Sequence, residues 1–77
     1  MNIKQLTIKY LLVYDDVTAL DISRTYGCSY SSVMEWLNQL EYLGYCNKEL
    51  EGKRFFFYKT QKLIEFKPFL DILVRVK

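Results

Sequence analysis

The spacing of apolar residues changes at Gly44, and this change limits the folds open to the chain. Before Gly44, apolar residues recur every three or four positions, which is the period of an amphipathic helix. After it come two short runs rich in aromatic and charged residues, a composition typical of strands. With 77 residues and 51% of them apolar, the chain can bury one core and is too short for two. The sequence therefore predicts a single α+β domain over 1–77.

The first two helices are marked by capping boxes. Asn2 and Gln5 have the spacing of such a box, and the apolar period behind them predicts a helix over 3–14 that ends at Asp15-Asp16. Thr18 begins a second box, completed by the acid three positions later, and predicts a helix over 19–26.

A glycine turn leads into the third helix. Gly27 stands where a left-handed residue closes the preceding helix, and Ser29 is expected to cap the next one. That helix is predicted over 30–43, stops at Gly44, and has an inward stripe of Val33, Leu37 and Leu40.

The remaining chain predicts a hairpin and a last helix. The two extended runs are split by Glu51-Gly52 and form a hairpin over 45–59. Thr60 can cap a helix over 61–75, which Pro68 would bend or split at the preceding residue. A strand over 72–76 is the alternative at the end of the chain.

This order of elements is that of a winged helix-turn-helix domain, with three helices, a two-stranded wing and a C-terminal helix. The residues also resemble those of winged-helix transcriptional regulators of small archaeal and archaeal-virus type, and more distantly MarR-like repressors. The resemblance is carried by Thr18-x-x-Asp21-Ile22-Ser23, Gly27 to Val33, Leu37, Leu40-Glu41-x-x-Gly44-Tyr45, and Gly52-Lys53-Arg54 with Tyr58-Lys59-Thr60.

The resemblance implies a partner and a mode of binding. The helix over 30–43 would enter the major groove of double-stranded DNA, and the hairpin would lie along a neighbouring minor groove or backbone. The last helix, often together with the first, would pair two subunits of a homodimer. The chain departs from the family pattern at two positions. Glu35 stands where a basic residue is common, and Lys59 replaces the usual leucine before the closing threonine of the wing.

The candidate DNA-binding residues come from the third helix and the wing. Hydroxyl and amide side chains on the helix can bond base edges or phosphates, and wing cations can neutralise phosphates. The set is Ser29, Tyr30, Ser31, Ser32, Glu35, Gln39, Lys48, Lys53 and Arg54.

Apolar residues of the first and last helices are the candidate dimer interface. A chain of this size has a thin core, so a second subunit would add burial that one copy cannot supply. The set is Ile8, Leu12, Leu63, Ile64, Phe66, Phe69, Leu70 and Leu73.

Other classes of protein are disfavoured by residues that the chain lacks. It has no histidine, and Cys28 and Cys46 are separated by the third helix, about 20 Å, which is too far for a disulfide. We therefore expect no metal site, no cofactor and no enzyme. No apolar run approaches the roughly 20 residues that span a bilayer, so we expect a cytoplasmic protein, in the host cell if the chain is viral.

A second function stays open at this point. Residues 29–44 carry Glu35 and Glu41 and no cation, together with Trp36 and Tyr42. Such a helix suits a protein partner, and the alternative is a winged-helix protein–protein interaction module that does not bind DNA.

Overall fold

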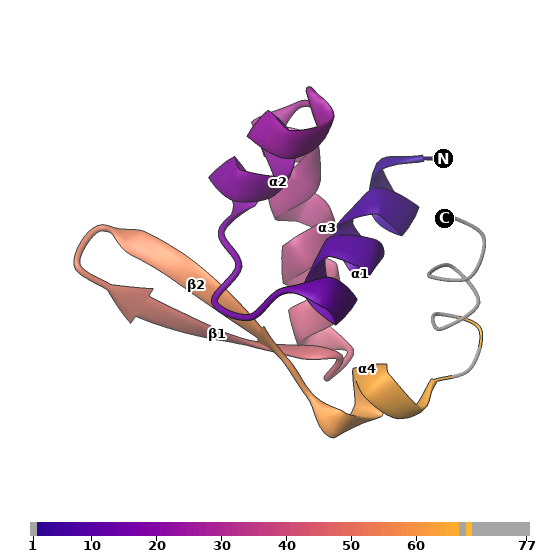
Figure 1. The fold of residues 1–77 in the computed structure, drawn as a ribbon. Coiled ribbons are helices and arrows are strands. Elements are labelled where there is room, and N and C mark those ends of the chain that lie inside the picture. The colour runs from indigo at the N-terminus through magenta and orange to yellow at the C-terminus, as the bar shows by residue number, and fades with distance from the viewer. Residues whose placement is uncertain (1, 67, 69–77) are drawn as a thin grey trace.

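The computed structural model describes residues 2–66 and 68. Three helices pack against one another, and a two-stranded antiparallel hairpin extends from them to one side, with a short helix at its base (Figure 1). The elements are α1 (Ile3–Val13), α2 (Ala19–Tyr26), α3 (Tyr30–Tyr42), β1 (Cys46–Glu51), β2 (Arg54–Lys59) and α4 (Gln61–Glu65). The predicted α+β class and order of elements are confirmed.

Several element boundaries differ from the prediction. α1 and α3 each end one residue early, because Tyr14 is extended and Leu43 serves as the C-cap. The first strand begins at Cys46 and not at residue 45. Glu51 pairs with Arg54, so the turn is Gly52-Lys53 and not Glu51-Gly52. Gly52 supplies the positive φ of 62° that a two-residue hairpin turn requires at its first position.

The break that the sequence predicted at residue 67 of the last helix falls earlier, at Phe66. α4 ends at Glu65, and Phe66 leaves the helical region with a ψ of 99°. Pro68 explains the stop, because it has no N–H for the carbonyl of Ile64 and its ring would clash with that carbonyl. The predicted remainder, 69–75, and the alternative strand over 72–76 lie outside the described residues.

The caps account for where the helices begin. Both predicted capping boxes form: Asn2 Oδ1 accepts from the N–H of Gln5 at 2.8 Å, and Thr18 Oγ1 accepts from the N–H of Asp21 at 3.1 Å. Ser29 occupies the N-cap position of α3, but its side chain makes no capping bond, which corrects the prediction. Gly27 closes α2 in the left-handed conformation, at φ 64° and ψ 37°.

One core is shared by all the elements. It contains Ile8, Leu11, Val17, Ala19, Ile22, Val33, Leu37, Leu40, Cys46, Phe57 and Leu63. Val17 extends the sheet by one residue beside β2: its N–H donates to the carbonyl of Phe57 at 3.0 Å, and the N–H of Phe57 donates back at 2.7 Å. This bridge, which the sequence did not predict, fixes the hairpin to the segment between α1 and α2.

Two side chains tie α4 to the end of α3. Thr60 does not cap α4 with its side chain; its Oγ1 donates to the carbonyl of Gly44 at 2.7 Å instead. Lys62 Nζ donates to the carbonyl of Leu43 at 2.7 Å and lies 4.6 Å from the centroid of the Tyr45 ring. Carbonyls at the C-terminal end of a helix lack helical partners, so these bonds stabilise the end of α3.

Candidate nucleic-acid interface

One face of α3 is exposed along the length of the helix. Its inward stripe is buried as predicted, and the opposite face presents Ser31, Glu35, Asn38, Gln39 and Tyr42. These five residues, called here the α3 outer face, recur at helical spacing, so they line one side. Tyr42 is 86% exposed. The sequence analysis selected three of them and missed Asn38 and Tyr42 as site residues, although both lie on the same helical period.

The N-terminal end of α3 holds the other predicted helix residues. Ser29 and Tyr30 are exposed, the latter at 53%, while Ser32 is half-buried at the edge of the helix. The site residues at this end are therefore accessible to a ligand to different degrees, and Ser32 is the least exposed of the three.

The hairpin has two faces of different chemistry. In an antiparallel pair, residues directly opposite each other project to the same side. The core-side face of the hairpin carries Cys46, Lys48, Leu50, Phe55, Phe57 and Lys59, and the outer face carries Asn47, Glu49, Glu51, Arg54, Phe56 and Tyr58. The core-side face is buried at Cys46 and Phe57 and becomes exposed toward the tip at Leu50 (60%) and Phe55 (42%).

Carboxylates gather on the outer face of the hairpin. Loss of water contact raises the pKa of Tyr58, and the carboxylates of Asp16, Glu51 and Glu49 raise it further. Glu49 and Glu51 therefore make this face acidic, with Arg54 as its cation at the tip.

The three predicted wing cations occupy two different surroundings. Lys53 and Arg54 are exposed at the tip and form no ion pair among the residues that the structure describes. Lys48 turns back toward α3: its Nζ donates to Asn38 Oδ1 at 3.3 Å and lies 5.0 Å from the centroid of the Phe55 ring.

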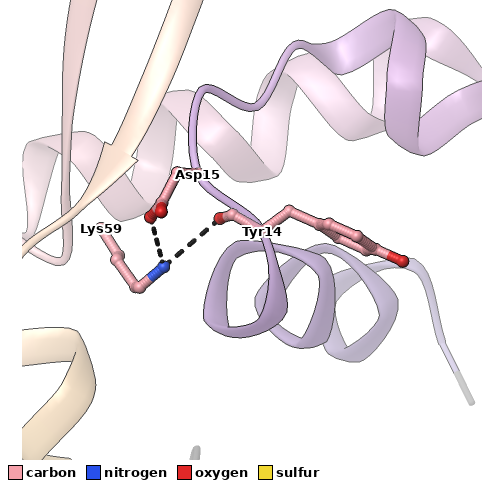
Figure 2. Close-up of polar contacts among 3 residues, drawn as sticks. All are labelled: Tyr14, Asp15 and Lys59. Carbon is pink, nitrogen blue, oxygen red and sulfur yellow. Dashed lines mark hydrogen bonds and ion pairs between the residues drawn. The ribbon is translucent and has the colours of Figure 1, made fainter.

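Lys59 forms the ion pair of the wing. Its Nζ lies 2.7 Å from Asp15 Oδ1 and donates to the carbonyl of Tyr14 at 3.4 Å (Figure 2). The charge of Lys59 is therefore neutralised within the chain, and its side chain is 20% exposed.

Two of the candidate interface residues belong to the core. Ile8 and Leu63 are 1% and 0% exposed in a single chain, so the expectation that they contact a second subunit is corrected. Leu12 is half-buried and packs against the core, whereas Ile64 and Phe66 are 39% and 38% exposed. Phe69, Leu70 and Leu73 lie outside the described residues.

Both cysteines are free thiols. Burial raises the pKa of Cys46 from its ordinary value near 9.0 to about 12, and the carboxylate of Glu41 adds to the shift. Cys46 is therefore a protonated core residue and not a reactive thiolate.

Residues 2–66 and 68 contain neither a cluster of metal-binding side chains nor a membrane-spanning helix. They hold no group of three or more acidic or cysteine side chains placed to share a metal ion. No helix among them has the length and hydropathy required to cross a bilayer.

A three-helix core with a glycine turn between α2 and α3, followed by a hairpin, defines a winged-helix domain. No protein-family model and no curated protein matches the chain. Several solved structures are similar to it. One is MepR, a transcription regulator of the Staphylococcus aureus multidrug efflux pump MepA, with a TM-score of 0.77 and 22% sequence identity. The match covers 97% of this chain and 58% of the MepR chain.

Two further structures show the same likeness. SSV1 F-93 has a TM-score of 0.73 at 15% identity, over 99% of this chain and 87% of its own. A MarR-family transcriptional regulator from Rhodococcus sp. RHA1 has a TM-score of 0.72 at 16% identity, over 99% of this chain and 55% of its own. These similarities establish the winged-helix fold. The chain spans just over half the length of MepR and of the Rhodococcus protein, and the archaeal or viral branch of the resemblance stays a prediction.

Proposed function

We propose that the chain is a sequence-specific regulator of transcription that binds double-stranded DNA. One observation carries the proposal: the α3 outer face is polar and exposed, and it lies beside a hairpin whose tip cations have no ion-pair partner among the described residues. An exposed helix of this kind fits the major groove, while phosphate contacts from a wing set the position of the domain on the duplex.

The residues divide into two groups by what they can contact. Gln39 and Ser31 can bond base edges, and the carboxylate of Glu35 can accept from the amino group of cytosine, so an acid on this face is compatible with a groove. Lys53 and Arg54 are suited to phosphates, which provide affinity without sequence preference.

We further propose a homodimer that acts in the cytoplasm. The exposed Ile64 of α4 supports a contact on this side of the molecule, and the sequence adds Phe69, Leu70 and Leu73 to it. Two copies related by a two-fold axis would read two half-sites about 34–36 Å apart.

Selection of bound sequences from random duplex DNA tests the proposal. We expect an enriched motif in two similar half-sites, and binding that weakens with salt at a slope of about −0.9 in log K per phosphate neutralised. The double variant K53M/R54M should flatten that slope and weaken all sequences alike. Absence of enrichment together with absence of a gel shift at low salt would contradict the proposal.

An acidic α3 supports a second candidate, a protein-binding winged helix. Glu35 and Glu41 are the charged residues of α3, and Tyr42 exposes a large ring beside them. Capture of a protein that E35A and Y42A abolish, by a chain that shifts no duplex, would select this candidate in place of the first.

A further inference from the structure

Lys48 and Asn38 join the hairpin to the α3 outer face. Lys48 Nζ lies 3.3 Å from Asn38 Oδ1, and both side chains are exposed. The same Nζ lies 5.0 Å from the centroid of the Phe55 ring on the neighbouring strand. Contacts from two elements, one polar and one aromatic, therefore hold this ammonium group beside the helix.

The strand register explains why this cation turns toward α3. Lys48 shares the core-side face with Cys46, whose thiol donates to the carbonyl of Leu37 at 3.7 Å. The base of the hairpin thus rests on α3 next to residue 38. Lys48 lies two positions further along β1 on the same face, so its side chain reaches Asn38 of the α3 outer face.

The contact directs N–H donors of both side chains away from the pair. An ammonium group has no acceptor, so the amide oxygen of Asn38 must face it and the NH₂ group must point elsewhere. Lys48 keeps two further N–H donors after bonding Asn38. Together the two side chains offer N–H groups from two nitrogen atoms, Lys48 Nζ and Asn38 Nδ2.

We propose that Lys48 and Asn38 act together as a base-reading pair that selects guanine in the major groove. The inference rests on the proposed function, because it assigns a base preference to the same surface. Guanine presents two neighbouring acceptors there, N7 and O6, which match two donors. The pair therefore specifies a G·C base pair in each half-site.

The same contact disfavours adenine. Asparagine recognises adenine by accepting from the N6 amino group while donating to N7. Here Lys48 occupies one of the two lone pairs of the oxygen that would accept, and its positive charge opposes the approach of the N6 donor. Cytosine is disfavoured for the same reason, because it presents an amino donor in the groove.

Substitution of single atoms in the DNA tests the pair directly. In the duplex obtained by selection, the guanine assigned to the pair is replaced by 7-deazaguanine, which lacks the N7 acceptor, and affinity is measured for the wild type, N38A and K48M. We expect the replacement to weaken wild-type binding about tenfold and to change the affinity of either variant less than twofold. F55L should show an intermediate effect, because it removes the ring that holds the ammonium group.

Two variants serve as matched controls. N47A removes the same amide from the outer face of β1, and K53M removes the same charge from the hairpin tip; both should retain the full response to 7-deazaguanine. Thermal unfolding of all variants should stay close to that of the wild type, because each substituted residue is exposed.

Three results would overturn the inference. One is a selected motif without guanine in the half-site, and another is a K48M variant that weakens every duplex equally and loses as much salt dependence as K53M. Either result would leave the regulator proposal standing. The K48M result would identify Lys48 as a phosphate contact. Failure to bind any duplex would overturn both proposals.

Discussion

Lys59 and Asp15 join the wing to the end of the first helix. The Nζ–Oδ1 distance is 2.7 Å, and the same ammonium group donates to the carbonyl of Tyr14 at 3.4 Å. Asp16 follows directly in a left-handed conformation at φ 55°, and Val17 then pairs with Phe57. The ion pair thus lies beside the tight turn that brings this segment onto β2.

Removal of Lys59 should leave DNA binding unchanged. We expect K59M to lower the free energy of unfolding by about 0–1 kcal/mol, the usual range for an exposed ion pair, and to keep the slope of affinity against salt. K53M should do the reverse, with unchanged stability and a slope reduced by about one. Urea unfolding and salt titration measure the two quantities; an equal loss of slope in K59M and K53M would refute the different roles of these lysines.

Cys46 should make the protein less stable in alkali. Its pKa is about 12 in the folded chain against an ordinary value near 9.0, so the unfolded chain releases the thiol proton first. Below pH 9 both states are protonated and stability does not depend on this group. As pH rises from 9 toward 12, the stabilisation is lost at about 1.4 kcal/mol per pH unit.

The variant C46A isolates this effect. The difference in unfolding free energy between wild type and C46A should stay constant from pH 7 to 8.5 and shrink above pH 9. Chemical denaturation under reducing conditions at each pH gives the comparison. A difference that stays constant up to pH 10.5 would show that the Cys46 thiol is not responsible.

Lys62 should stabilise the end of α3. K62M removes a hydrogen bond to the carbonyl of Leu43, a cation near the C-terminal end of the helix dipole, and a contact with the Tyr45 ring. We expect a loss of about 1 kcal/mol in unfolding free energy. K62R should retain most of the stability, since it keeps the charge and the donors. Equal stability of K62M and the wild type would mean that the contact contributes nothing.

Replacement of Gly27 by any other residue should lower the stability of the fold, because of the backbone conformation at this position. Its φ is 64°, and a Cβ placed there would meet no atom within 4 Å. The penalty of G27A is therefore conformational and not steric, about 1–2 kcal/mol, and G27N should cost less because asparagine adopts this conformation more readily. Thermal unfolding ranks the three proteins, and a G27N less stable than G27A would contradict the explanation.

The parts of the fold that short-range signals encode could be predicted. Both capping boxes, the left-handed Gly27 and the inward stripe of α3 depend on residues within a few positions of one another, and all are observed. A break caused by Pro68 was predicted at residue 67, but α4 already ends at Glu65, because the effect of Pro68 reaches back four residues. Nothing in the local sequence indicates that the side chain of Ser29 leaves α3 uncapped.

The candidate site was predicted only in outline. Helical period alone marks Asn38 and Tyr42 as outward residues, so that signal was present in the sequence. Nothing local reveals that Lys48 turns to α3 while Lys59 turns to Asp15, because the contacts join different elements, 10 and 44 positions apart in the chain.

The sequence by itself determined the order of helices and strands and the inward side of each, since periodicity, caps and glycines act over a few residues. Tertiary structure alone decided which cations remain available to a ligand and which apolar residues remain at the surface. Ile8 and Leu63 entered the core, and Lys59 was neutralised, because packing brought distant segments together. The charge and hydrophobicity of a side chain depend on its residue type, whereas its exposure depends on the tertiary structure around it.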